Sequence, residues 1–248
     1  MFFNEKTIQY LRGNLFSSEL VIPVSKYFEP VKYRLDSIVE ISKDKNIIHL
    51  GCADHLPLIK EKIQNSTWLH GLLHQNSKTC IGIDINQEAV TYIRDELGYD
   101  KVFFSNILVD EIIEINGKHW DYLIVGEILE HVDNPQLFLN TIKQKYGKTI
   151  DKIIITVPNV YSLPKIVSAL FNVERINSDH RYVFSPYSLG KILAMSEIKV
   201  DYFFFCEETP KKYSGAPLSK KLAFFIYNRI ISVFPALREK IFIVASLN

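Results

Sequence analysis

Short apolar runs alternate with helix-spaced segments along this chain of 248 residues, and that alternation restricts the folds open to it. Strands joined by helices of ten to fifteen residues form βαβ units, in which the strands are parallel. The sequence therefore predicts an α/β fold with a Rossmann-like sheet and helices on both faces. The apolar runs that we expect to be strands are 46–50, 80–85, 102–104, 122–125, 152–157, 200–206 and 240–246.

The stretch 121–135, DYLIVGEILEHVDNP, places several polar groups at one predicted strand end. Its apolar run, 122–125, is short enough to be a strand buried on both faces. Glu127, Glu130 and His131 follow at i, i+3 and i+4, so a helical turn would place their side chains on one side. Open α/β sheets bind ligands at the carboxyl ends of their strands. We therefore expect a site here, although the polar residues of a solvated loop would give the same composition.

Three other strand ends carry residues suited to a nucleoside ligand. The first strand runs into Gly51, Cys52 and Ala53, whose small side chains let the backbone approach a ligand closely. The second ends at Asp84, where an acid can accept hydrogen bonds from ribose hydroxyls. The third is followed by Asn106, whose amide suits either a base edge or an Asx turn.

Composition and charge exclude several classes of protein. The 29 basic and 28 acidic residues give a net charge of +1, so no overall field attracts nucleic acid or anionic lipid. The three cysteines form no CxxC pair, which fits a reducing compartment. The first residues do not resemble a signal peptide, and no apolar run is long enough to span a membrane. We expect a cytoplasmic protein with no transmembrane segment.

Helices are expected between and around the strands, and two of these segments allow more than one interpretation. His70 and His74 have a zinc-binding spacing on a helix, but no third ligand is nearby, so we expect both to face solvent. The aromatic segment 218–234 fits an amphipathic helix packed on its own domain; a lid, a dimer contact and a membrane-surface helix are the alternatives. The expected helices are 5–12, roughly 25–41 (punctuated by Pro30), one within 56–78, 87–97, 136–145, 163–171 and 187–195.

From about Asn46 to Ser196, these motifs together resemble class I S-adenosylmethionine-dependent methyltransferases. IIHLGCADH is similar to their glycine-rich first motif, IGIDIN to the second, SNILVD to the adenine-side loop and DYLIVGEILEHVDNP to the fourth-strand motif. ITVPN and SDHRYVFSPYSLGKIL are similar to a branch with ubiquinone-biosynthesis O-methyltransferases and methyltransferases of glycan and secondary metabolism. His49 stands where this family usually has an acid, and His55 where it has a third glycine, so a non-catalytic binding protein on a degenerate fold is an alternative.

The resemblance implies a seven-stranded, mostly parallel sheet whose last strand is antiparallel. It implies one domain, 1–248, with an N-terminal helical cap (1–42), a cofactor-binding core (43–160) and substrate-side helices with the last strands (161–248). An NAD-dependent oxidoreductase is disfavoured because GCADHL lacks the pattern G-x-G-x-x-G. The residues expected to bind S-adenosylmethionine are Gly51, Cys52, Ala53, Asp84, Ile85, Asn106, Ile107 and Glu127.

His131 and His180 are the best candidates for a catalytic base, because a neutral imidazole titrates near working pH; Glu127 is expected beside them. Some small-RNA 2′-O-methyltransferases and ubiquinone-type enzymes resemble this chain in having two glutamates and a histidine near the fourth strand and a later histidine. That resemblance implies a site for Mg²⁺ or another divalent cation at Glu127, Glu130, His131 and His180. Such an ion would lower the pKa of a bound hydroxyl. Without an ion, Glu130 and His131 would make structural hydrogen bonds.

The leading interpretation is O-methylation of a small-molecule or glycan-type hydroxyl acceptor, such as a nucleotide-linked sugar or a unit of a surface polysaccharide. A quinone or lipid methyltransferase is the alternative, in which segment 218–234 would meet a membrane. RNA methylation is less favoured, because the charge is balanced and no basic stripe interleaved with aromatic residues is present. The sequence leaves a homodimer open.

Overall fold

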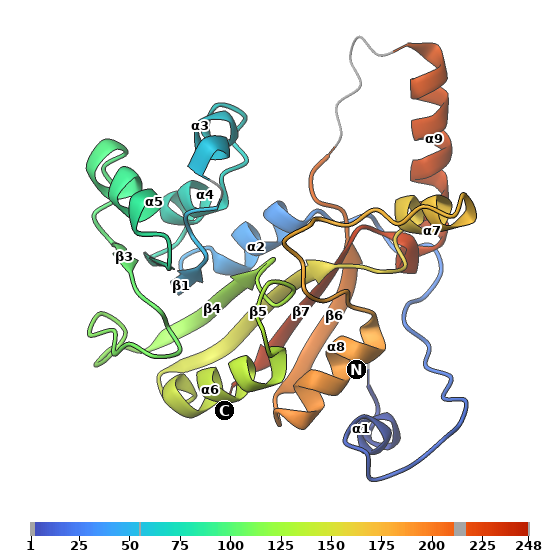
Figure 1. The fold of residues 1–248 in the computed structure, drawn as a ribbon, viewed down its shortest axis with the longest axis horizontal. Coiled ribbons are helices and arrows are strands. Elements are labelled where there is room, and N and C mark those ends of the chain that lie inside the picture. Colours follow the sequence, from blue (N-terminus) through green and yellow to red (C-terminus); the bar gives the residue numbers. More distant parts are fainter. Residues whose placement is uncertain (1–2, 55, 211–216, 248) are drawn as a thin grey trace.

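The computed structural model describes residues 3–54, 56–210 and 217–247, and within them seven strands form one sheet (Figure 1). Each strand lies within about two residues of its predicted position. The strands are β1 (Asn46–Leu50), β2 (Thr79–Asp84), β3 (Val102–Phe104), β4 (Trp120–Gly126), β5 (Ile150–Pro158), β6 (Lys199–Cys206) and β7 (Lys240–Ser246).

The order of the strands is β3-β2-β1-β4-β5-β7-β6, and β7 alone runs against its two neighbours, β5 and β6. The expected sheet, mostly parallel with an antiparallel last strand, is confirmed. The chain moves outward from β1 to β3 and then returns to place β4 on the other side of β1. The carboxyl ends of β1 and β4 therefore form a topological switch point, where sheets of this kind bind ligands.

Helices pack on both faces of the sheet. One face is covered by α6 and α8, which join a cluster of buried apolar side chains with β1, β4 and β5. On the other face, α2 and α4 pack against the same strands and β7. The α-helices are α1 (Glu5–Leu11), α2 (Arg34–Ser42), α3 (Leu56–Gln64), α4 (Leu69–Asn76), α5 (Gln87–Thr91), α6 (Pro135–Tyr146), α7 (Leu163–Leu170), α8 (Pro186–Met195) and α9 (Leu218–Val233); a π-turn (Tyr92–Glu96) extends α5, and a 3₁₀ turn (Pro235–Leu237) follows α9.

Two helices begin at the caps that the sequence predicts. The side chain of Asn134 accepts a hydrogen bond from the Leu137 amide, and Pro135 takes the first helical position of α6. At α8, Ser185 and Ser188 form a reciprocal capping box in front of the buried Leu189. Such caps satisfy amide groups that have no partner inside the helix. Within the described residues, none of the helices combines the length and the apolar content needed to span a bilayer.

The predicted helix over 25–41 is wrong in its first part, because α2 begins only at Arg34. Pro30 has no amide hydrogen, and it disfavours helical backbone in the preceding residue. The segment instead pairs with the chain that leaves β6: the amide of Arg34 donates to the Glu207 carbonyl at 2.7 Å, and the Glu207 amide donates to Lys32 at 2.9 Å. The end of this segment is therefore fixed at the carboxyl edge of the sheet.

Asn159, directly after β5, joins two parts of the chain that are distant in sequence. Its side-chain amide donates to the carbonyls of Ala236 and Arg238, each at 2.8 Å, and its oxygen accepts from the Tyr161 amide at 3.0 Å. Asn159 is fully buried. It therefore ties the residues that follow α9 to the turn in front of α7.

Replacing Asn159 with alanine is expected to lower the free energy of unfolding by about 2–4 kcal/mol, because buried carbonyl groups lose their donors. Urea denaturation of the variant and the wild type would measure the change. Asn116→Ala, at an exposed position, is the matched control and should stay within about 0.5 kcal/mol of the wild type. Equal stabilities of the two variants would contradict the anchoring role of Asn159.

Candidate functional site

A pocket of about 580 Å³, here called the strand-end pocket, lies at the carboxyl ends of β1, β2 and β4. Its position follows from the register, which pairs Leu50 with Ile83 on one side and with Val125 on the other. The residues that directly follow these three positions therefore come together at one place. The predicted residues that line this pocket are Gly51, Asp84, Ile85, Asn106, Ile107, Glu127 and His131.

The turn after β1 is fixed to the end of β2 by Asp84. This carboxylate accepts hydrogen bonds from the amides of Ala53 and Asn86, each at 2.9 Å. Burial raises the pKa of Asp84 above its ordinary value, although these backbone hydrogen bonds oppose the rise. Gly51 has φ +70°, a left-handed conformation that favours glycine, and a Cβ atom there would lie 2.9 Å from Cδ1 of Ile128. The absence of a side chain at Gly51 keeps this wall of the pocket open.

Two of the expected cofactor residues do not line the strand-end pocket. Cys52 and Ala53 are buried and pack against Val90 and other apolar residues below the turn. His55 lies outside the described residues. Asn106 lines the pocket and also shapes its own loop: its side-chain oxygen accepts from the Leu108 amide at 3.1 Å.

Glu127 does not begin a helical turn with Glu130 and His131, so that part of the prediction is wrong. Its backbone is left-handed, with φ 57°, and the tight turn starts one residue later, with the His131 amide donating to the Ile128 carbonyl at 2.9 Å. The carboxylate of Glu127 forms an ion pair with Lys240 at the start of β7. The side chains of Glu127 and of the Glu130–His131 pair therefore have different partners.

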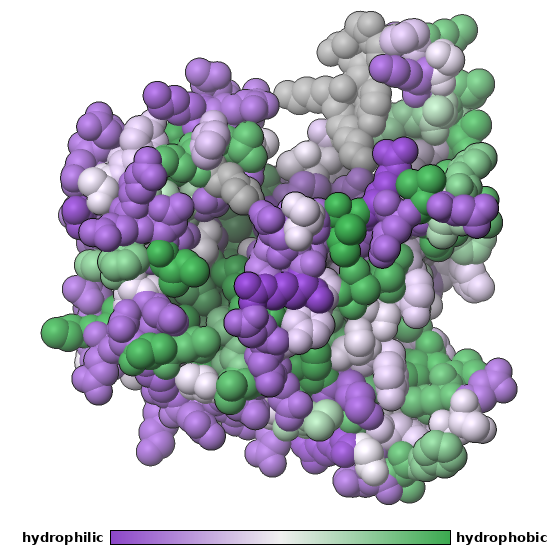
Figure 2. Space-filling view, viewed as in Figure 1, coloured by the Kyte–Doolittle hydropathy of each residue, from purple (hydrophilic) through white to green (hydrophobic). Residues whose placement is uncertain are grey.

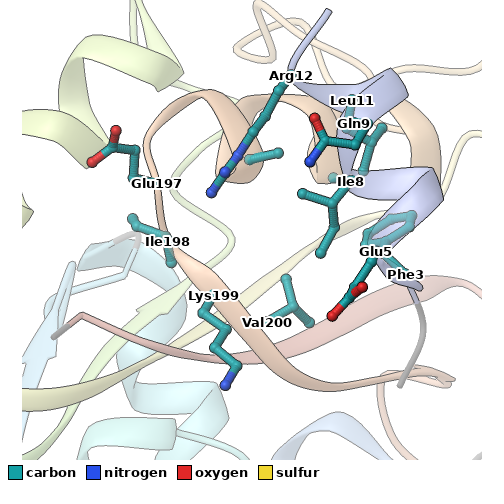
Figure 3. A pocket seen from close by; sticks show the side chains of 12 residues that line it. Phe3, Glu5, Ile8, Gln9, Leu11, Arg12, Glu197, Ile198, Lys199 and Val200 are labelled. Carbon is teal, nitrogen blue, oxygen red and sulfur yellow. The ribbon is translucent and has the colours of Figure 1, made fainter. Parts of the chain in front are cut away.

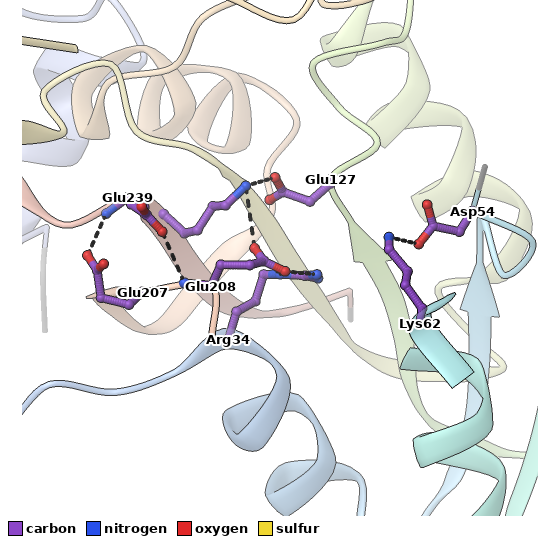
Figure 4. A network of polar contacts seen from close by, with 8 residues as sticks. Arg34, Asp54, Lys62, Glu127, Glu207, Glu208 and Glu239 are labelled. Carbon is purple, nitrogen blue, oxygen red and sulfur yellow. Dashed lines mark hydrogen bonds and ion pairs between the residues drawn. The ribbon is translucent and has the colours of Figure 1, made fainter. Parts of the chain in front are cut away.

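Glu127 belongs to a network of four ion-paired residues from four parts of the chain, shown in Figure 4. Arg34, at the start of α2, donates from Nε to both carboxylate oxygens of Glu208 at 2.9 Å. Lys240 lies between Glu208, at 3.5 Å, and Glu127. Sequence reasoning missed Arg34, Glu208 and Lys240. In the sequence each is only a lone charged residue beside an apolar segment, which does not show that the three meet.

The charges of this four-residue network stabilise one another. Burial disfavours the charge of Glu208, but Arg34 holds the pKa of this carboxyl group down to about 2. Glu127 and Glu208 likewise hold the pKa of Lys240 above its ordinary value despite its burial. Glu208 and Lys240 are therefore ionised near neutral pH, and so is Arg34, whose pKa is raised by its acidic neighbours despite its burial.

Glu130, His131 and His180 come together beside the network. One potential ligand atom from each lies within 4.8 Å of the others, and the two imidazole rings meet edge to face. Both carboxylate oxygens of Glu130 are buried without a hydrogen-bond partner among the described residues. Nδ1 of His131 lies 3.1 Å from the Asp179 carbonyl, so this nitrogen carries the hydrogen and a neutral His131 leaves Nε2 as an acceptor.

Burial shifts the pKa of both Glu130 and His180 away from the ordinary values. Burial, and then the neighbouring Glu127, raise the pKa of Glu130 well above its ordinary value. Burial and the neighbouring His131 lower the pKa of His180, which keeps its imidazole neutral at neutral pH. An orphaned carboxyl group beside two imidazoles fits a divalent cation such as Mg²⁺ or Zn²⁺, because it provides three suitable ligand groups.

A second cavity of about 560 Å³, here called the polar pocket, opens on the other side of the cluster. His180 lines the polar pocket, whereas His131 lines the strand-end pocket. In the same way, Lys240 lines the polar pocket, whereas its ion-pair partner Glu127 lines the strand-end pocket. The two pockets therefore share a wall made of these two contacting pairs. The other charged or amide-bearing residues of the polar pocket are Lys165, Arg175, Asn177, Glu208 and Glu239.

The expectation that His70 faces solvent is wrong. His70 is buried, and its Nδ1 lies 3.3 Å from Nδ1 of His49. Burial and the mutual proximity of the rings lower the pKa of His49, and burial lowers that of His70 to about 3, so both rings are neutral. His49, in the position where an acid was expected, thus contacts α4 and does not line the strand-end pocket. His74 is exposed, as predicted.

A further pocket of about 490 Å³ lies between α1, α8 and the start of β6. Figure 3 shows its mixed lining, with Arg12, Gln9 and Glu5 on one side and Glu197 and Lys199 on the other. None of the predicted site residues lines it. This pocket is therefore separate from the two pockets at the carboxyl edge.

The sequence matches no protein-family model and no curated protein. Solved structures do match the fold. Small RNA methyltransferase HEN1 superposes with a TM-score of 0.56 at 11% identity, covering 91% of this chain and 27% of that one. The methyltransferase domain of a bacterial CtHen1 gives 0.51 at 16% identity, covering 86% and 96%. Magnesium protoporphyrin IX methyltransferase from Synechocystis PCC 6803, with bound SAH, gives 0.50 at 11% identity, covering 86% and 81%.

These likenesses establish the fold: the chain has the class I fold of S-adenosylmethionine-dependent methyltransferases. The agreement extends over nearly the whole chain. The finer resemblance, to ubiquinone-type and glycan methyltransferases, stays a prediction.

Glu208→Gln is expected to lower the free energy of unfolding at pH 7 by about 1–3 kcal/mol, because Arg34 and Lys240 lose a charged partner. The folded-state pKa of Glu208 is depressed from 4.5 to about 2. Its stabilising effect is therefore complete above about pH 4.5 and disappears as the pH falls through about 2.

Denaturation of wild type and variant across this pH range would measure the difference. Glu114→Gln, at an exposed position, is the control and should stay within about 0.5 kcal/mol of the wild type at pH 7. A constant difference between wild type and Glu208→Gln from pH 7 down to pH 3 would rule out the ion pair as its cause.

Proposed function

We propose that this protein is an S-adenosylmethionine-dependent methyltransferase that methylates a hydroxyl group of a small-molecule or glycan-type acceptor. One observation carries the proposal: the strand-end pocket and the polar pocket meet at His131 and His180. A methyl donor in the first pocket and an acceptor in the second would face each other across imidazole groups that can accept a proton. The fold supports the choice of donor, and one of its structural neighbours carries bound SAH.

The strand-end pocket is assigned to S-adenosylmethionine. Asp84 retains lone pairs beyond those used by the Ala53 and Asn86 amides, so it can accept hydrogen bonds from ribose hydroxyls. The neighbouring Ile85 and Ile107 offer apolar surface for an adenine ring. Gly51 leaves room for the methionine part near Glu127. The sulfonium of this cofactor supplies an activated methyl group.

The polar pocket is assigned to the acceptor. Lys165 and Arg175 contribute positive charge, and Asn177 contributes an amide group. Such groups suit an acceptor that carries several hydroxyls or a phosphate, such as a nucleotide-linked sugar or a polysaccharide unit. The lowered pKa of His180 leaves an imidazole lone pair available to accept the proton of the reacting hydroxyl. His131, fixed by the Asp179 carbonyl, holds the His180 ring from the side.

As an alternative to the role of His180 as a proton acceptor, we propose a divalent cation at Glu130, His131 and His180, where the imidazole lone pairs would bind the ion. The orphaned Glu130 carboxylate supports it, because a bound cation would give both oxygens a partner. Mg²⁺ or a similar ion there would act as a Lewis acid and lower the pKa of an acceptor hydroxyl. Glu127 is also expected as a metal ligand and catalytic residue, but its carboxylate is paired with Lys240. Glu127 could bind the ion only if it released Lys240.

A ribose hydroxyl of RNA is a second candidate acceptor. One structural neighbour is named as small RNA methyltransferase HEN1, and another is the methyltransferase domain of a bacterial CtHen1. Lys165 and Arg175 could pair with a phosphate next to a terminal ribose. Methyl transfer to short single-stranded RNA, compared with transfer to nucleotide-linked sugars, separates the two candidates.

Gly51→Ala is expected to weaken S-adenosylmethionine binding at least about tenfold, because the new methyl group occupies the pocket wall against Ile128 and strains a left-handed backbone. Calorimetric titration with S-adenosylmethionine measures the affinity. Gly117→Ala is the matched control: it has the same strain, with φ +75°, but no atom lies within 4 Å of its Cβ. Equal affinities in wild type and Gly51→Ala would remove the cofactor from this pocket.

His180→Ala is expected to reduce kcat about 100-fold or more and to leave S-adenosylmethionine affinity unchanged, because a proton acceptor is lost at the acceptor side. The assay follows transfer of a labelled methyl group to a panel of nucleotide-linked sugars and short RNAs. His119→Ala, at the amino end of β4, is the control and should retain activity.

EDTA and added magnesium in the same assay test the ion. Loss of wild-type activity in EDTA and its return with Mg²⁺ would support the site, as would calorimetric Mn²⁺ binding that Glu130→Gln abolishes. Indifference to EDTA would remove the ion from the mechanism, and full activity of His180→Ala would remove His180 from catalysis.

A further inference from the structure

Helix α7 exposes its apolar side. Its single buried side chain is Ser168, whereas Leu170 is 77% exposed and the adjoining Phe171 is 74% exposed. Ile166 and Val167 are exposed on the same side of the helix. An amphipathic helix of a soluble domain normally turns its apolar side toward the core. The opposite orientation of α7 leaves a row of apolar side chains exposed on the surface of the described structure.

Helix α9 has a second exposed apolar side. Leu218, Leu222, Phe225 and Ile226 have the spacing of one helical face, and Leu218 is 82% exposed. The opposite side holds the helix to the protein near its end, where Ile231 is buried and the Tyr227 hydroxyl donates to the Glu207 carboxylate at 2.7 Å. Figure 1 shows α9 projecting away from the sheet, and Figure 2 shows apolar residues, in green, along its outer edge. The expectation that this segment packs on its own domain is thus wrong for its first half.

The two helices belong to one region of the molecule. Asn159 binds the carbonyls of Ala236 and Arg238, just after α9, and lies three residues before the N-cap of α7, Ser162. A third apolar group joins them, because the Phe28 amide donates to the carbonyl of Val233 at 3.2 Å. Phe28 is 76% exposed, and the neighbouring Tyr27 contacts the ring of Phe234. We call the exposed apolar side chains of α7, α9 and 27–28 the apolar surface.

The charges on these helices have one sign. Helix α9 contains Lys220, Lys221 and Arg229, all exposed, and α7 contains Lys165; neither helix contains an acidic residue. The whole chain is nearly neutral, with 29 basic and 28 acidic residues, so this separation is local. Apolar side chains flanked by lysine and arginine are complementary to a bilayer with anionic head groups. A second copy of the chain would instead bring like charges together, and nucleic acid offers no partner for Leu218, Leu222 and Ile226.

We propose that the apolar surface docks on an anionic membrane surface, with the exposed sides of α7 and α9 inserted among the head groups. The proposal goes beyond methyl transfer and does not depend on it. Pro164 and Lys165, in the first turn of α7, line the polar pocket. A docked protein would therefore hold this pocket close to the bilayer.

Liposome flotation of the full chain without cofactor tests the proposal. The wild type is expected to float with vesicles of phosphatidylglycerol and phosphatidylcholine in equal parts, and to stay in the dense fraction with phosphatidylcholine alone. Leu170→Glu/Phe225→Glu is expected to lose several-fold of the floated fraction, because two carboxylates replace apolar side chains at the contact. Ile113→Glu, 79% exposed in the connection from β3 to β4, is the matched control and should float like the wild type.

Retained S-adenosylmethionine affinity of the double variant would show that its fold and donor pocket are intact, which separates a loss of docking from a failure of the proposed function. The proposal is overturned if the wild type fails to float with anionic vesicles, or if the double variant floats as well as the wild type. It is also overturned if the surface serves another partner: either the wild type is a dimer in sedimentation and the double variant a monomer, or the double variant loses RNA binding in place of vesicle binding.

Discussion

The ion pairs among Arg34, Glu208, Lys240 and Glu127 hold the carboxyl edge of this sheet together. They join the start of α2, the chain after β6, the start of β7 and the turn after β4. A parallel sheet gathers its strand ends at one edge, but the segments beyond them have no ladder to fix their positions. Alternating charges provide that restraint, and their burial makes each charge depend on its neighbour.

The same network defines the two pockets and their chemistry. Because Glu127 is neutralised by Lys240, Glu130 is left as a buried carboxyl group without a cationic side chain of its own. Either a proton or a cation could compensate this carboxyl group, and ligand atoms of His131 and His180 lie within 4.8 Å of it. The geometry thus gathers Glu130, His131 and His180 in the wall between the pockets and keeps the carboxylate of Asp84 on the strand-end pocket alone.

Much of the fold could be predicted from the sequence, because buried parallel strands are short, apolar and closed by turns, as at 46–50 and 152–157. The residues that line the strand-end pocket could be predicted for the same reason. The orientation of individual side chains could not be predicted in this way. Glu127 has a left-handed backbone and is therefore not part of the expected helical turn. His70, on α4, is buried where it contacts His49 on β1. Both depend on contacts between segments distant in sequence, which spacing along the chain does not encode.

The connection between β6 and β7 illustrates how such a fold can diversify. Cys206 and Lys240 are paired residues of neighbouring antiparallel strands, so everything between them leaves the sheet and returns to the same point. A loop of this kind can lengthen or be exchanged without altering the order of any strand. The strand-end pocket is thereby insulated from change, while α9 is free to evolve toward whatever the molecule must approach.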